Sequence, residues 1–126
     1  MKFEHYALNV PQPAEMARWY VEHLGFQIVR SSGDEREVHF LADETGRVVV
    51  EIYRNPAGLT QDFPAMHPLS FHAAVVSADA RADSARLQAA GATLVVEEAL
   101  PDGSLLIMLR DPWGVPLQLC QRARPF

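Results

Sequence analysis

The chain has 126 residues, of which 48% are hydrophobic, enough for one ordinary core and too few for two conventional domains. A formal net charge of -5 argues against nucleic acid or anionic lipid as a partner and favours a small molecule. Cys120 is the only cysteine, which excludes an internal disulfide and predicts a reducing, cytoplasmic location. The opening "MKFEHYALNV" lacks a long apolar run, so neither a signal peptide nor a membrane span is expected.

The first half of the chain predicts one strand, one helix and three more strands. Residues 3–10 have the apolar content of a buried strand. Residues 11–26 open with prolines, space apolar side chains at helical intervals and reach a stop signal at Gly25. Three sequential strands separated by Gly- and Asp-containing turns follow at 26–32, 36–43 and 46–54.

The same order of elements returns after the irregular, proline-containing segment 55–68. A strand is expected at 69–76, then a helix at 77–91 that is capped by Ser77 or Asp79 and ends at Gly91. Three strands follow at 92–100, 103–111 and 114–122, and Pro116 in the last one predicts an edge or a bulge. We therefore expect one domain over 1–126, made of a βαβββ module (1–55), a linker (56–68) and a second βαβββ module (69–126).

An internal repeat allows equivalent positions to be compared within one sequence. His5 and His72 take matching places in the first strands of the two modules. The offset in sequence number between these histidines also relates Glu51 to Gln118 in the last strands. Four side chains with nitrogen or oxygen donors thus occupy two pairs of equivalent positions.

Glu51 is conspicuous because it interrupts the valine-rich segment "RVVVEIYR". Strand alternation puts it on a face with Val49 and Tyr53, opposite the apolar face of Val50 and Ile52. Burying an unpaired carboxylate costs roughly several kcal/mol, so Glu51 is expected to face a cation or strong donors. Two imidazoles, one carboxylate and one amide oxygen are suitable ligands for divalent Zn, Ni, Mn or Fe.

The doubled pattern, with "HYALNV", "HLGFQIV", "VVEIYR", "FHAAVV" and "DPWGVPLQL", resembles the vicinal oxygen chelate superfamily of glyoxalases, bleomycin resistance proteins and extradiol dioxygenases. The resemblance covers Phe3 to Gln121 and implies an α+β fold in which two tandem βαβββ modules form a curved eight-stranded mixed sheet. It also implies metal ligands from the first and fourth strands of each module, which here are His5, Glu51, His72 and Gln118.

Bacterial glyoxalase I is the most similar member in ligand placement, but it usually has Glu where this chain has Gln118. An amide oxygen can bind a metal, yet it cannot act as a base. The resemblance then leaves Glu51 as the one candidate for moving a proton between adjacent carbons of a metal-chelated substrate. It further implies a homodimer, with each metal site inside one chain or shared between two.

Other polar and aromatic residues receive structural assignments. His23, His39 and His67 have no counterpart in the other module and are expected on the surface or in loops. Trp19 and Tyr20 are expected in the core. Further residues remain open as pocket or turn contacts, or as candidates for binding an anionic substrate: Trp113, Arg18, Arg30, Arg54, Arg110 and Arg122.

Three functions remain open from the sequence. The first is a metal-dependent lyase or isomerase of glyoxalase type, in which Glu51 transfers a proton. The second is a non-haem iron dioxygenase that uses His5, His72 and Glu51, although family members place the carboxylate at the position of Gln118. The third is a protein of the bleomycin resistance kind that binds a small molecule without chemistry, which the amide at Gln118 favours.

Overall fold

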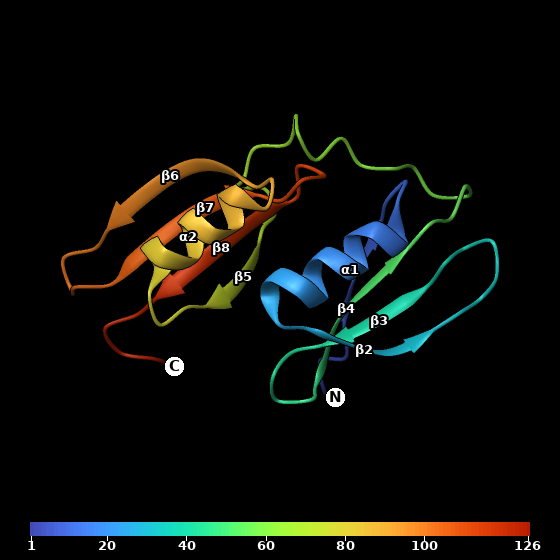
Figure 1. Cartoon of the computed structure of the whole chain (residues 1–126), viewed down its shortest axis with the longest axis horizontal. Helices are drawn as coiled ribbons and strands as arrows, with labels where there is room; N and C mark the ends of the chain where they lie inside the picture. The colour runs from blue at the N-terminus through green and yellow to red at the C-terminus, as the bar shows by residue number, and fades with distance from the viewer. The chain divides into compact units, whose positions relative to one another are not determined.

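A computed structural model describes residues 1–126 as two compact units, Met1–Gln61 (unit 1) and Asp62–Phe126 (unit 2). The boundary falls inside the irregular segment 55–68. No helix is long and apolar enough to cross a membrane. The elements, shown in Figure 1, are β1 (Tyr6–Asn9), α1 (Pro13–Leu24), β2 (Gln27–Ser31), β3 (His39–Ala42), β4 (Val48–Tyr53), β5 (Ala73–Val76), α2 (Ala80–Ala89), β6 (Thr93–Ala99), β7 (Leu105–Arg110) and β8 (Pro116–Gln121).

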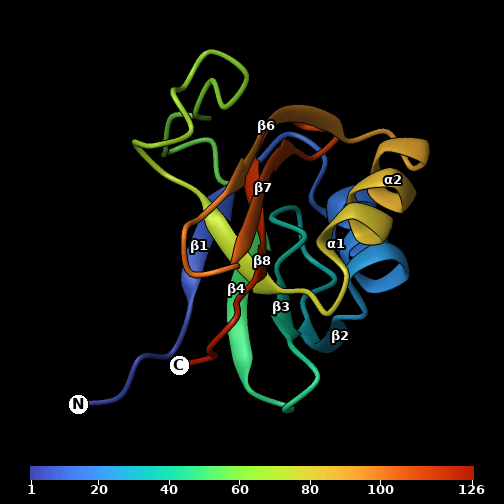
Figure 2. The same ribbon diagram turned by 90° about the vertical axis from the view of Figure 1, so that its left-hand side faces the viewer.

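The sheet of unit 1 has the strand order β1-β4-β3-β2. Strand β1 runs parallel to β4, whereas β4, β3 and β2 are antiparallel neighbours. Helix α1 packs against β2, β3 and β4 and forms a layer on one side of the sheet, as Figures 1 and 2 show. The buried apolar side chains of this layer include Met16, Tyr20, Leu41, Val50 and Ile52.

Helix α1 is bounded by the signals that its sequence predicts. Pro13 stands at the start, where the missing N–H leaves no hydrogen bond unmade. Gly25 ends the helix with a left-handed φ of 72° and donates its N–H to the carbonyl of Tyr20. Trp19 and Tyr20 are 8% and 1% exposed, which confirms their assignment to the core.

The second unit repeats this architecture with the strand order β5-β8-β7-β6 and a parallel β5–β8 pair. Helix α2 packs on β6, β7 and β8 and lies to one side of them in Figure 2. Asp79 caps the helix by accepting from the N–H of Ala82, whereas the Ser77 hydroxyl donates to the carboxylate of Asp83. Both units therefore have the βαβββ order that the sequence predicts, in an α+β fold of two four-stranded mixed sheets.

Three local expectations differ from the structure. His5 and His72 precede β1 and β5, because each strand pairs with only one neighbour and its ladder begins at the following residue. Pro116 opens β8, an internal strand rather than an edge, since the first position of a strand tolerates a residue without an N–H.

His39 is the third difference, because its ring points into the protein rather than to the surface. It lies in β3 and pairs with Ile52, so the imidazole is on the side of the sheet that α1 covers. Both of its ring nitrogens are buried without a hydrogen-bond partner. Burial lowers the pKa of His39, against the smaller opposing effect of the Glu37 charge.

Candidate functional site

The sheet face of unit 1 that points away from α1 carries a mixed row of side chains. Ala7 and Phe40 both lie opposite Glu51 in the strand register, and Arg30 lies opposite Phe40. Residues directly opposite each other in neighbouring strands project from the same face. Ala7, Glu51, Phe40 and Arg30 therefore form one row across four strands, with a carboxylate in the middle and a guanidinium at the open edge.

His5 stands beside this row and faces the carboxylate of Glu51. Its Nε2 lies 3.2 Å from Glu51 Oε2, and its ring meets the ring of Phe40 edge-on at 5.4 Å between centroids. The side chains of His5 and Glu51 are 23% and 22% exposed. Two of the four residues predicted to bind metal thus come together in unit 1.

The separation of these two donors fits a shared divalent ion. Nitrogen and oxygen ligands lie about 2.1 Å from zinc, so two neighbouring ligands of one ion stand roughly 3 Å apart. The other nitrogen, His5 Nδ1, is 2.7 Å from Glu4 Oε2, but that oxygen lies off the line of a ring N–H. His5 Nδ1 is consequently buried without a hydrogen bond.

The second unit places an apolar row at the equivalent positions. Ala74 and Met108 lie opposite Gln118, and Val96 lies opposite Met108. Gln118 thus takes the place of Glu51, as the internal repeat predicts. Met108 takes the place of Phe40, and Val96 that of Arg30. The charged row of unit 1 has a largely apolar counterpart in unit 2.

His72 is held by the chain just before it. Its Nδ1 lies 3.0 Å from the carbonyl oxygen of Pro68. A carbonyl only accepts hydrogen bonds, so Nδ1 carries the proton and Nε2 of the neutral ring carries the free lone pair. Metal-binding histidines are commonly oriented by such a bond to a backbone carbonyl.

Gln118 has one defined partner, the thiol of Cys120 on the same face of β8. The sulfur donates to Gln118 Oε1 at 3.3 Å. Burial raises the pKa of Cys120, against a smaller lowering by the charge of Arg122. Cys120 is therefore a neutral, buried thiol that helps to orient the amide, and its raised pKa disfavours a role as nucleophile.

The five candidate arginines fall into different environments. Arg110 donates to the carbonyl oxygens of Phe63, Met66 and Gly114 at 2.6 to 2.9 Å, so its guanidinium holds the turn before β8 and the start of unit 2 together. Arg122 lines a hollow in unit 2. Of the others, Arg18 and Arg54 lie near carboxylates and Arg30 ends the row of Glu51.

Trp113 belongs to the same turn before β8. Its backbone N–H donates to the carboxylate of Asp111, which also accepts from the N–H of Val115. This geometry supports the turn role for the "DPWG" segment. Phe40 and Met108, which flank Glu51 and Gln118, were not singled out from the sequence.

No set of three or more His, Cys, Asp or Glu side chains is gathered into a metal-binding group. The structure brings His5 and Glu51 together within unit 1 and puts Gln118 at the equivalent position of unit 2. Convergence of all four residues on one ion stays a prediction.

Comparison with known families agrees with the fold. The model of the Glyoxalase/Bleomycin resistance protein/Dioxygenase superfamily matches residues 2–119. No curated protein is similar enough in sequence to count as a match.

Several solved structures share this fold. TnmS3, an antibiotic binding protein from Streptomyces sp. CB03234, is 21% identical, with 98% of this chain and 97% of that chain covered and a TM-score of 0.68. Lactoylglutathione lyase from Agrobacterium tumefaciens is 15% identical, with 94% and 92% covered and a TM-score of 0.67. A bleomycin resistance determinant encoded on the transposon Tn5 is 20% identical, with 98% and 100% covered and a TM-score of 0.61. At these identities the similarity shows the fold alone.

Proposed function

Because the chain belongs to the Glyoxalase/Bleomycin resistance protein/Dioxygenase superfamily, we propose that it is a divalent-metal-dependent lyase or isomerase of glyoxalase type. The proposed ligands are His5, Glu51, His72 and Gln118, provided by one chain or by two chains of a homodimer. The observation that carries the proposal is the 3.2 Å approach of His5 Nε2 to Glu51 Oε2. The orientation of His72 by Pro68 supports it.

The proposed chemistry depends on a division of work between a carboxylate and an amide. A bound divalent ion polarises two adjacent oxygens of a substrate and makes a neighbouring C–H group more acidic. Glu51 then accepts the proton from that carbon and returns it to the next one. Gln118 has no ionisable group, so it can only bind through Oε1, and His5 and His72 act as neutral nitrogen donors.

A second function, binding of an antibiotic or similar small molecule without chemistry, has its own support. The row beside Gln118 contains Ala74, Met108 and Val96, which suits an apolar ligand surface better than a proton-transfer site. TnmS3 and the Tn5 determinant have the same fold and are described as an antibiotic binding protein and a bleomycin resistance determinant. This function does not require a metal ion.

Metal affinity separates the two functions. We expect purified protein to bind about one Ni²⁺ or Zn²⁺ per chain, and Glu51→Gln and His72→Gln each to weaken binding by at least about 10-fold, since each removes a ligand or its charge. His23→Gln is the matched control, because His23 lies on α1 and is not a proposed ligand. Equal affinity of the wild type and Glu51→Gln, or no binding at all, would move the assignment to the binding function.

Turnover is then measured with methylglyoxal and glutathione, by comparing the wild type with Glu51→Gln and Gln118→Glu. If Glu51→Gln loses activity when excess metal keeps its site occupied, the result supports proton transfer by Glu51. Activity unchanged in Glu51→Gln contradicts it. Light scattering during size-exclusion chromatography tests the proposed homodimer.

A further inference from the structure

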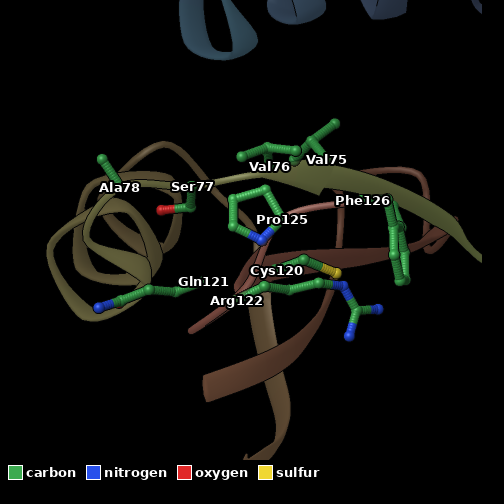
Figure 3. A pocket seen from close by; sticks show the side chains of 10 residues that line it. Val75, Val76, Ser77, Ala78, Cys120, Gln121, Arg122, Pro125 and Phe126 are labelled. Atoms are coloured by element: carbon green, nitrogen blue, oxygen red, sulfur yellow. The ribbon is translucent and has the colours of Figure 1, made fainter. Parts of the chain in front are cut away.

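A hollow of about 570 Å³ opens at the carboxyl ends of the parallel strands β5 and β8 in unit 2. Ligand pockets for small molecules typically have volumes of about 300 to 1,000 Å³, so its size suits one small organic molecule. In Figure 3, Ser77 and Gln121 lie toward one end of the hollow, whereas the sulfur of Cys120, the side chain of Arg122 and the ring of Phe126 gather toward the other.

The hollow is next to Gln118 on the same sheet face. Ala74 lies opposite Gln118 and Val76 lies opposite Cys120, so these four side chains project together from β5 and β8. Cys120, which lines the hollow, donates a hydrogen bond from its thiol to Gln118 and so connects the hollow to that amide. A molecule in the hollow therefore lies beside the amide that we propose as a metal ligand.

Most of the wall is apolar. Val76 is 89% exposed, and the side chains of Pro125 and Phe126 provide further apolar surface. Covering a branched apolar side chain and an aromatic ring is favourable at about 25 cal/mol per Å² removed from water. The body of the ligand is thus expected to be aromatic or branched aliphatic.

Arg122 has the only charged side chain in the wall. Its guanidinium carbon lies 4.5 Å from the centroid of the Phe126 ring. No carboxylate is within ion-pair distance of it, whereas the guanidinium of Arg81, for example, has one. Hydrogen bonds from Ser104 lower the pKa of Asp102, and the charge of Arg122 adds a smaller lowering, so one acidic group is near enough to compete weakly.

We propose that this hollow binds a small organic anion, with its aromatic or branched aliphatic body against Val76 and Phe126 and its carboxylate or similar group on Arg122. The inference names the ligand class of the site proposed above, and it rests on that proposal for the role of Gln118. Binding in the hollow itself involves side chains of the second unit alone and needs no metal ion.

The test uses the full chain, treated with a chelator, and a pair of probes that differ in charge: 2-naphthoate and the neutral 2-naphthalenemethanol. Calorimetry gives the two affinities, and amide NMR shifts locate binding. A charge-assisted contact at a partly exposed site favours the anion by about fivefold. We expect this preference in the wild type, with the largest shifts at Val76, Cys120 and Arg122.

Variants decide whether Arg122 is responsible. Arg122→Gln should bind both probes equally and keep its affinity for the neutral one, while Arg124→Gln, a change in a nearby arginine outside the hollow, should keep the preference. Equal affinity of the wild type for both probes, shifts centred elsewhere, or the same loss in both variants would overturn the inference.

The outcome is separable from that of the metal titration. Binding of naphthoate without any metal affinity would preserve the hollow and its ligand class, and would assign them to a binding protein. Metal affinity without naphthoate binding would remove this inference and leave the proposed enzyme intact.

Discussion

Replacing His39 by isoleucine should raise the free energy of unfolding, because it removes two buried ring nitrogens that have no hydrogen-bond partner. In unit 2 the equivalent position is Ile107, since His39 lies opposite Ile52 in β4 and Ile107 lies opposite Leu119 in β8. Ile107 is 1% exposed, so the fold accommodates an apolar β-branched side chain there. The substitution His39→Ile makes the first unit resemble the second at this point.

The expected magnitude follows from the two buried ring nitrogens of His39 that have no partner. A buried unsatisfied polar group costs about 1–3 kcal/mol, and an apolar replacement removes that cost. We expect His39→Ile to raise the free energy of unfolding by at least about 1 kcal/mol near pH 7.5. The reverse exchange, Ile107→His, is the matched control and should destabilise the protein by a comparable or larger amount.

Lowering the pH should increase the stability advantage of His39→Ile over the wild type. The pKa of His39 in the folded state lies below its ordinary value of 6.5, so the unfolded chain binds the proton more readily. Wild-type stability from this group is therefore complete above about pH 6.5 and falls as the pH drops through that value toward the folded pKa. One proton gives at most about 1.4 kcal/mol per pH unit, and the effect is smaller here because the residue as a whole is half-buried although its two ring nitrogens are covered.

Urea unfolding followed by circular dichroism at pH 7.5 and pH 5.5 measures both quantities. The difference between His39→Ile and the wild type should be positive at pH 7.5 and larger at pH 5.5. A less stable variant at pH 7.5, or a difference that shrinks with acid, would refute the reasoning about the buried imidazole.

Two further comparisons test how the elements are bounded. Asp79→Ala should lower the free energy of unfolding by about 1 kcal/mol relative to the wild type, because the hydrogen bond from the N–H of Ala82 that caps α2 is lost. Gly114→Ala should destabilise the protein more than Gly46→Ala. Both glycines have a positive φ, of 82° and 77°, so alanine strains the backbone at either position. An added Cβ at Gly114 also comes within 2.5 Å of the Pro64 ring, whereas one at Gly46 meets no atom within 4 Å. Denaturant midpoints check both comparisons.

Much of the fold could be predicted from the sequence by means of local signals and the internal repeat. Proline and glycine bound α1 where expected, and one constant offset in sequence number relates Glu51 to Gln118 in matching registers with Ala7 and Ala74. These features depend on residues close in sequence or on a spacing that the two modules share, so they are readable from one chain.

The same offset fails for the third strand of each module, which explains what was missed. Phe40 lies opposite Glu51 and Met108 lies opposite Gln118, but the offset between these two neighbours is larger by one. The reason is a register shift between Leu41 and Ala42, where β4 has one extra residue, Val49, whereas β7 and β8 pair without a shift. The constant offset would pair Phe40 with Ile107, which faces the helix instead. His39 was expected at the surface for the same reason, since its true counterpart was not recognised.

The proposed proton transfer and the proposed anion binding place different requirements on the residue at position 118. Restoring a carboxylate with Gln118→Glu adds a charged metal ligand and a second possible base, which favours proton transfer. The same carboxylate would lie next to Met108 and Cys120, beside a hollow whose only charged side chain is that of Arg122. There its negative charge would repel a bound anion. A site for an anion with an apolar body requires an oxygen donor without a negative charge, and the amide of Gln118 is such a donor.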